Sequence, residues 1–203
     1  MPRISAANIA EHVQQQEDAI LKAAAQLFAE KGVAATEIGD IAKAVGLARP
    51  SLYRYFPDKD HILLRWFERE LEPVIERSDA IIDGPGSWEQ RLLAWMDYQL
   101  EFVQNPEHDL APTLTREIGA VSPDVQAAIG AGHAQLYGTL RRLVEEALDA
   151  EHQPRAPRRD AAVVTSLLGG LVQAAAQSAI AGANPRHVRT ELHRAARSVL
   201  AGV

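Results

Sequence analysis

The 203-residue sequence contains no cysteine, which excludes disulfides, thiolate zinc sites and cysteine nucleophiles together. Aromatic residues make up only 5% of the chain, and no strand or hairpin pattern occurs in it. No apolar run reaches about 18 residues, so we expect no membrane-spanning segment. The N-terminus also lacks the basic-then-apolar layout of a signal peptide. These absences together predict a cytoplasmic protein.

Sequence signatures of catalysis are missing as well. The seven histidines are scattered, with no HExxH helix and no repeated carboxylate–histidine spacing. Neither a GxSxG elbow nor a glycine-rich phosphate loop is present. We therefore predict that the protein is not an enzyme and holds no metal or cofactor.

Helical patterns occupy almost the whole chain, in a composition that is 47% hydrophobic and 24% charged. Residues 1–16 have a weaker pattern, which favours a forward extension of the first helix or disorder over a DNA-reading arm. Ser87 with Gln90, and Asn184 before Pro185, predict helix starts. We expect an all-α fold with helices over about 17–31, 38–45, 49–56, 58–82, 87–104, 107–120, 123–150, 159–182 and 185–200.

The most informative stretch is TEIGDIAKAVGLARPSLYRYFPDK, residues 36–59. Its first part has an apolar face at helical spacing, begins at a potential N-cap, Thr36, and ends at Gly46. Arg49-Pro50 opens a second helix, with proline in the first turn where its missing N–H costs nothing. Two short helices joined by a tight glycine-containing turn predict a helix-turn-helix.

The second helix of this motif has one inward and one outward face. Leu52, Tyr55 and Phe56 share the inward side by their spacing. The outward set combines guanidinium, hydroxyl, phenol and apolar groups that suit base edges and phosphates, and it comprises Arg49, Pro50, Ser51, Tyr53 and Arg54. The alternative is a helical hairpin whose charged residues are merely solvated.

Charge is distributed unevenly, although the whole chain carries a net charge of −6. Residues 41–59 hold four basic side chains and one acidic side chain, a local excess of three positive charges. Because electrostatic steering depends on the local patch, such a strip is compatible with DNA binding. The acidic remainder predicts few phosphate contacts and a modest salt dependence.

The segment EDAILKAAAQLFAEKGVAATEIGDIAKAVGLARPSLYRYFPDKDHIL resembles the N-terminal domain of TetR-type (tetracycline-repressor-like) transcriptional regulators. The resemblance is specific over about residues 17–64, and beyond them it extends only to the helical layout. It implies that the outward set faces bases or nearby backbone, and that phosphates are held by Thr36, Tyr55 and Lys59. Two departures from the family pattern are Ala48, in place of a capping serine, and Gly39-Asp40, which offer no outward arginine.

The resemblance also implies an organisation and a function. Residues 1–58 would form a three-helix DNA-binding domain, and residues 59–203 a helical domain for ligand binding and dimerisation. The protein would be a sequence-specific transcriptional regulator, most simply a repressor, that a small molecule releases from double-stranded DNA. The alternative is an all-helical small-molecule-binding or interaction protein without DNA-binding activity.

An effector pocket in the second domain would be lined by apolar and aromatic side chains with a few polar ones. An apolar or aromatic effector would favour a conformer in which the helix over 58–82 has swung. Trp95, Phe102 and His133 have ordinary core positions as their alternative, and Gln173 a place in the dimer interface. The candidate lining is Trp66, Trp95, Gln99, Phe102, Leu114, Glu117, His133, Tyr137 and Gln173.

The last two helices predict a homodimer. Small residues around Gly169-Gly170 would let a second helix approach closely, and the amphipathic final helix would complete a four-helix interface. The alternative is that these residues pack only within one subunit. A two-fold dimer would place its recognition helices in successive major grooves of a near-palindromic operator. The candidate interface residues are Leu167, Gly170, Leu171, Ala174, Leu192, Ala195 and Val199.

Overall fold

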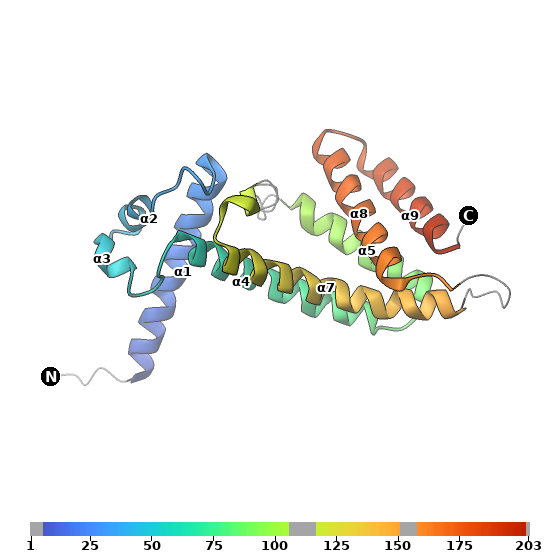
Figure 1. Ribbon diagram of the computed structural model, residues 1–203, viewed down its shortest axis with the longest axis horizontal. Coiled ribbons are helices and arrows are strands. Elements are labelled where there is room, and N and C mark those ends of the chain that lie inside the picture. Colours follow the sequence, from blue (N-terminus) through green and yellow to red (C-terminus); the bar gives the residue numbers. More distant parts are fainter. Residues whose placement is uncertain (1–5, 106–116, 151–157, 202–203) are drawn as a thin grey trace. The chain divides into compact units, whose positions relative to one another are not determined.

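The computed structural model describes residues 6–105, 117–150 and 158–201, and these ranges contain helices and turns but no strand (Figure 1). The predicted all-α fold is therefore confirmed. Of the short helix expected over residues 107–120, all but the last few residues lie outside the described ranges. The helices are α1 (Ala6–Lys31), α2 (Ile38–Ala44), α3 (Arg49–Leu52), α4 (Lys59–Ile82), α5 (Trp88–Gln104), the 3₁₀ turn η2 (Ile118–Ala120), α7 (Pro123–Ala150), α8 (Ala161–Ile180) and α9 (Pro185–Ala201).

The chain forms two compact units. The first comprises Met1–Glu70 and Asp109–Gly130, and the second Leu71–His108 and Ala131–Val203. Two helices, α4 and α7, therefore contribute residues to both units.

In the first unit, α1 supplies the apolar support for the helix-turn-helix. Its buried stripe includes Ile20, Ala24 and Phe28, as the spacing predicts. Residues 6–16 continue the same helix forward, which agrees with the predicted extension. Gly32, at φ +87°, ends α1 in a left-handed conformation that favours glycine.

The start of α2 differs from the prediction by one residue. Its N-cap is Glu37, whose backbone N–H is bonded by the Asp40 carboxylate at 3.2 Å. The Thr36 hydroxyl instead donates to the carbonyls of Gly32 and Leu27. The prediction that Thr36 caps α2 is therefore wrong, because its side chain points into the preceding loop.

In the second unit, α5, α7, α8 and α9 share one hydrophobic core with the end of α4. Helix α8 packs against both α5 and α9 (Figure 1). Polar pairs join α5 to α9 at the edge of this core, His193 to Asp97 and Arg189 to Glu101, both at 2.8 Å. Full burial of each large apolar side chain contributes about 1.5–3 kcal/mol, so this core is the main support of the unit.

Helix ends in this unit follow the sequence signals closely. Ser87 and Gln90 form the predicted capping box at α5. The Asn184 side chain accepts the first-turn N–H groups of Arg186 and His187 at α9, also as predicted. The Arg159 guanidinium donates to the last carbonyls of α9, a contact that local sequence does not signal.

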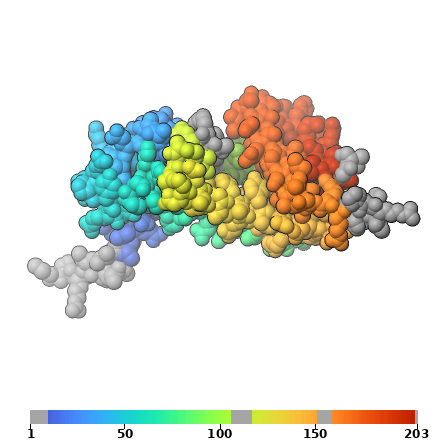
Figure 2. All heavy atoms as spheres, in the orientation of Figure 1, coloured from blue at the N-terminus to red at the C-terminus, as the bar shows by residue number. Residues whose placement is uncertain are grey.

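Helix α8 keeps one apolar side at the surface. Among the described helices it alone is long and apolar enough to cross a membrane. Its most apolar 18-residue stretch has a mean hydropathy of 1.4, and 33% of that stretch is buried. Figure 2 shows α8, in orange, exposed on the face in view. A single such helix is weak support for a membrane span, and the contacts of α8 with α5 and α9 make it a bundle helix with an uncovered side.

Candidate nucleic-acid interface

Helix α3 is short, and buried side chains on its inner side fix its position. It covers only Arg49–Leu52, with Pro50 in its first turn and no side-chain cap from Ala48. Backbone hydrogen bonds continue the turn to Phe56, whose N–H donates to the Leu52 carbonyl at 3.1 Å. Leu52 and Phe56 are both buried, so these two side chains fix the orientation of the segment.

The opposite side of this segment faces outward. Arg49, Pro50 and Arg54 are exposed, and the Tyr53 side chain is 45% exposed. Ser51 and Tyr55 are half-buried. The predicted outward set thus lies on one accessible surface, where cationic, phenolic and apolar groups stand together with the properties that base and phosphate contacts require.

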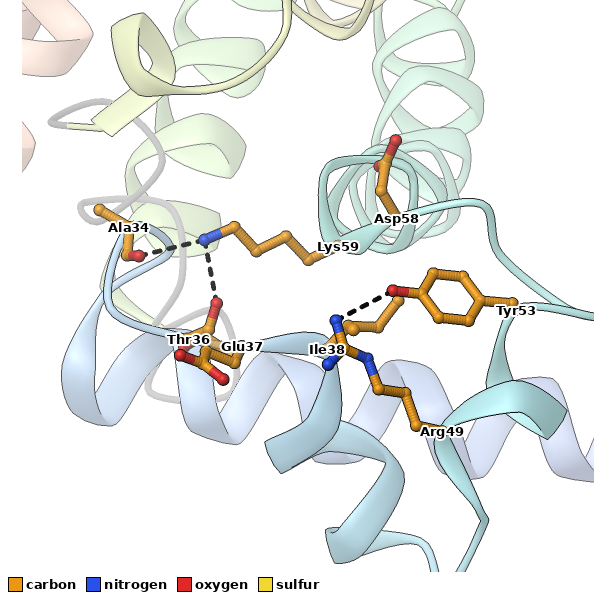
Figure 3. Close-up of a pocket in the computed structure, with 8 residues that line it drawn as sticks. All are labelled: Ala34, Thr36, Glu37, Ile38, Arg49, Tyr53, Asp58 and Lys59. Carbon is orange, nitrogen blue, oxygen red and sulfur yellow. Dashed lines mark hydrogen bonds between the residues drawn. The ribbon is translucent and has the colours of Figure 1, made fainter.

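Two members of this surface are bonded to each other. The Arg49 guanidinium donates to the Tyr53 hydroxyl at 3.2 Å and lies 5.9 Å from the centre of its ring (Figure 3). A cation at this distance from an aromatic face is weakly attracted to it. The pair therefore presents its guanidinium in one preferred direction instead of as a freely rotating chain.

Arg49 and Tyr53 form one wall of an open cleft of about 390 Å³. The loop between α1 and α2, the start of α2 and the start of α4 form the rest of the cleft, which carries charges of both signs (Figure 3). The lining residues are Ala34, Thr36, Glu37, Ile38, Arg49, Tyr53, Asp58 and Lys59.

Lys59 and Thr36, two of the expected phosphate contacts, are engaged inside the protein. The Lys59 ammonium donates to the carbonyls of Val33, Ala34 and Thr36 at 2.7, 3.1 and 2.9 Å. Thr36 is only 1% exposed, and its hydroxyl is occupied by two carbonyls. An ammonium has three N–H donors and a hydroxyl has one O–H donor. Neither side chain therefore has a donor left for a phosphate unless these bonds are exchanged.

Glu117 has a role that the sequence did not suggest. It is among the predicted effector contacts, but its Oε2 accepts the backbone N–H groups of Val33 and Ala34 at 2.7 and 3.1 Å. The bond spans more than 80 positions of sequence, so no local pattern could reveal it. The same loop between α1 and α2 thus receives both the Lys59 ammonium and the Glu117 carboxylate.

The remaining effector candidates are divided between the two units. Trp95, at 1% exposed, lies in the core of the second unit, and its indole N–H has no hydrogen-bond partner among the described residues. Gln99 is also buried there and donates to the Ser78 hydroxyl at 3.0 Å. Tyr137 packs against the same core, and burial raises the pKa of its hydroxyl. The structure therefore brings Trp95, Gln99 and Tyr137 to one core.

The other candidates have varied surroundings. Trp66, in the first unit, and Phe102, in the second, are half-buried, while His133 and Gln173 are exposed on α7 and α8. Leu114 lies outside the described residues.

The expected dimer residues fall into three groups by exposure. Leu167 is 53% exposed, Gly170 and Ala174 are exposed beside it on α8, and Leu171, Ala195 and Val199 are half-buried. Leu192 is only 4% exposed and packs in the subunit's own core. Gly169 also serves that core, because an added Cβ would lie 2.6 Å from the Tyr137 ring. The two glycines thus differ, with Gly169 directed inward and Gly170 outward.

No group of three or more potential metal ligands occurs within the described ranges. The arrangement of the first unit supports contacts to an extended polyanion, through an exposed surface of mixed polar and cationic side chains on a buried apolar base.

Comparisons with known proteins agree with this geometry. Residues 20–65 match the family described as "Bacterial regulatory proteins, tetR family". The HTH-type transcriptional regulator EthR of Mycolicibacterium smegmatis is 38% identical over 69 residues, which cover 34% of this chain and 30% of the relative. The HTH-type transcriptional repressor KstR2 of Mycobacterium tuberculosis is 31% identical over 97 residues, 48% of each chain. These alignments thus span at most about half of the curated relatives' length.

The fold extends beyond the matched segment. The crystal structure of the regulator FadR of Bacillus subtilis, in complex with stearoyl-CoA, superposes with a TM-score of 0.73 at 18% identity. The superposition covers 91% of this chain and 98% of that one. Both the N-terminal helix-turn-helix and the C-terminal helical region therefore follow the architecture of these regulators.

Proposed function

We propose that this chain, whose residues 20–65 belong to the tetR family of bacterial regulatory proteins, is a sequence-specific transcriptional regulator. It acts in the cytoplasm as a repressor that a small molecule releases from its operator, without catalysing a reaction. The observation that carries this proposal is the surface of α3 and its following turn, where Arg49, Tyr53 and Arg54 face solvent above the buried Leu52 and Phe56. Residues 1–58 form the DNA-binding part, and residues 59–203 bind the effector and the second subunit.

The base and phosphate contacts fall mainly to exposed side chains. Arg49 and Arg54 suit guanine edges or phosphates, Tyr53 and Ser51 offer hydroxyls, and Pro50 an apolar contact for a thymine methyl. Tyr55 lies at the edge of this set. Thr36 and Lys59 act by shaping the loop between α1 and α2, because their polar groups are already bonded there.

The effector is an apolar or aromatic small molecule that enters the second unit. Trp95, Gln99 and Tyr137 are the polar groups available to orient it in an apolar core. A buried donor without a partner costs about 1–3 kcal/mol, so an effector that accepts from the Trp95 N–H would recover this free energy. The complex of a similarly folded regulator with stearoyl-CoA supports a ligand with a large apolar part.

Release follows from a shift between two conformers. Helix α4 begins at Lys59, whose ammonium binds three carbonyls of the loop before α2, and it ends in the second unit. A movement of α4 would therefore disturb the loop from which α2 and α3 start.

Two subunits act together. The exposed α8 surface of Leu167, Gly170 and Ala174, with the half-buried Leu171, Ala195 and Val199 beside it, forms the subunit interface. Leu192 is left out of it, because its side chain is buried within one subunit. The resulting dimer reads a near-palindromic double-stranded operator.

The test is the binding of Arg49→Ala and Tyr53→Ala to a duplex that the wild-type protein selects from a random pool. Each lost base contact costs about 1–3 kcal/mol, so we expect the Kd to rise by about tenfold to a hundredfold. Fluorescence anisotropy measures the Kd, and thermal unfolding should be nearly unchanged because both side chains are exposed.

The matched control is Arg194→Ala, which removes an exposed guanidinium from α9. It should leave the Kd as in the wild-type protein. Normal binding by both Arg49→Ala and Tyr53→Ala would contradict the assignment of the surface of α3 and its following turn as the DNA-reading surface. Failure of the wild-type protein to select any duplex would favour a small-molecule-binding protein without DNA-binding activity.

A further inference from the structure

The loop between α1 and α2 is bonded by a carboxylate that belongs to the first unit but is distant from the loop in sequence. Glu117 Oε2 accepts from the N–H groups of Val33 at 2.7 Å and Ala34 at 3.1 Å. The other carboxylate oxygen lies against Gly32, where an added Cβ would be only 2.6 Å from Oε1. Gly32 thus ends α1 and also leaves room for the carboxylate.

The carbonyl groups of the same loop are bonded by a cation, the Lys59 ammonium. Lys59 donates to the carbonyls of Val33, Ala34 and Thr36. Bonds to charged groups are roughly twice as strong as neutral ones. Val33, Ala34 and Thr36 of this loop are therefore bonded to one carboxylate or one ammonium, and both of these groups come from outside the segment that α1, α2 and α3 form.

The residues that follow Glu117 are bonded to the start of α4. The Asp60 carboxylate accepts the Ser122 N–H at 2.8 Å, and His61 Nε2 lies 3.7 Å from the Asp124 carboxylate. Residues 117–124 therefore contact the loop before α2, which lies in the DNA-binding part, and also the first turn of α4. These contacts all lie in the first unit.

The same residues lead directly into α7. This helix runs without interruption from Pro123 to Ala150, and its residues from Ala131 onward belong to the second unit. Tyr137 and Leu140 on α7 pack in the core where the effector is proposed to enter. The turn η2 and helix α7 thus join Glu117 along the chain to the residues that line that core.

We propose that Glu117 is a positioning residue that couples α7 to the DNA-reading surface through the loop between α1 and α2. The inference rests on the proposed function, since it names the means by which that surface is regulated. The loop sets where α2 begins, and α2 carries α3 through the turn at Gly46. Loss of the carboxylate frees two loop N–H groups, loosens the reading surface and uncouples it from α7.

Coupling between two sites is reciprocal, so DNA itself can serve as the probe in place of an effector. Binding of a duplex should change amide hydrogen exchange in residues 131–147 of α7 in the wild-type protein. In Glu117→Ala this response should be lost, while exchange at Val33 and Ala34 rises by about tenfold or more. The Kd for DNA should rise by about threefold to thirtyfold, since the contacts themselves remain.

Two further variants make the result specific. Glu117→Gln keeps an uncharged acceptor of the same shape, so it should give an intermediate rise in exchange at the two loop amides. Glu145→Ala removes an exposed α7 carboxylate that pairs only locally with Arg141, and it should behave as the wild-type protein does. Because Glu117→Gln preserves the packing, it keeps the test valid even if Glu117→Ala folds poorly.

The outcomes separate clearly. Unchanged exchange at Val33 and Ala34 in both Glu117 variants would overturn the proposal. Weaker DNA binding with a normal α7 response would overturn the coupling and leave only a structural role for the carboxylate. If the wild-type protein selects no duplex, the proposed function fails first, and this inference falls with it.

Discussion

The Arg49 guanidinium donates a hydrogen bond to the Tyr53 hydroxyl within the subunit. A guanidinium that is already oriented loses less side-chain entropy when it meets a base, because part of the ordering has occurred within the protein. The bond also makes the two side chains interdependent. Their substitutions should therefore be non-additive, as expected for residues in direct contact.

His61 is a second residue whose surroundings have a measurable consequence. Its ring bonds the Asp58 carboxylate at 2.8 Å and faces Asp124 and Asp60. The hydrogen bond to Asp58 and the nearby carboxylates raise the pKa of His61 above 6.5, against the opposing effect of burial. Burial is the largest single influence on Asp58 and would raise the pKa of that carboxyl, but its bonds to His61 outweigh it and lower the pKa.

A pH dependence of stability follows from these directions. A raised His61 pKa stabilises the folded state fully below pH 6.5, and this contribution is lost as the pH rises through the folded-state pKa. His61→Gln should therefore lower the free energy of unfolding more at about pH 5.5 than at about pH 8.5. Urea unfolding at both pH values measures the difference, with His12→Gln, on the exposed side of α1, as control.

An equal effect of His61→Gln at the two pH values would show that the charged form of the ring contributes nothing. The lowered pKa of Asp58 does not affect this comparison. The contribution of Asp58 to the free energy of unfolding is lost only at much more acidic pH than the two values used.

Residue spacing predicted which side chains of the helix-turn-helix are buried, but it could not predict the long-range polar contacts. The spacing of Leu52 and Phe56 is a local property, and both are buried as expected. The bonds of Lys59 and Glu117 to the loop depend on which distant segments meet in the fold. These contacts, like those of the Thr36 hydroxyl with the carbonyls of Gly32 and Leu27, therefore required the structure.

At the scale of elements, α8 exposes large apolar side chains that no other described helix of the subunit covers. Its buried side faces α5 and α9, while Val163 and Leu167 are left exposed on the other side, and the exposed small residues Gly170 and Ala174 follow them along the helix. Apolar exposure on a helix of this kind is typical of a subunit interface. The sequence predicted the small-residue side of α8, although it did not distinguish Gly169 from Gly170.

Leu167→Glu should therefore weaken the homodimer. A carboxylate in an apolar interface is desolvated without a partner, and the two-fold axis introduces it twice. We expect the dimer dissociation constant to rise at least about tenfold in sedimentation equilibrium, and binding to a two-half-site duplex to weaken in parallel.

Val13→Glu is the matched control, because Val13 is an exposed apolar residue on α1 in the other unit. It should leave the subunit equilibrium unchanged. A Leu167→Glu variant that remains as tightly dimeric as the wild-type protein would show that the exposed side of α8 is not the interface.

At the scale of the whole molecule, an excess of positive charge is a local property of residues 41–59. The chain has a net charge of −6, yet Lys43 on α2, Arg49 on α3 and Arg54 in the turn after α3 are exposed cations of the first unit. Lys59 is excluded from this count, because its ammonium is occupied by three carbonyls. Non-specific attraction to DNA should therefore be weak, and specificity should depend on base contacts.

The salt dependence of DNA binding tests this view. Three cations in each subunit of a dimer predict a slope of about −5 for log K against log salt concentration. Anisotropy titrations over about 50–300 mM salt measure the slope. Lys43→Gln should make it shallower by about two, whereas a wild-type slope near −10 would mean that further cations, Lys59 among them, reach the phosphates.

The part of the chain that folds the DNA-binding segment and the part that faces outward share almost no side chains. Leu52 and Phe56 hold the segment, while Arg49, Pro50 and Arg54 lie outside the core. Exposed substitutions usually change stability by less than about 0.5 kcal/mol. A lineage could therefore exchange these outward residues one at a time, and acquire a new operator through intermediates that all remain folded.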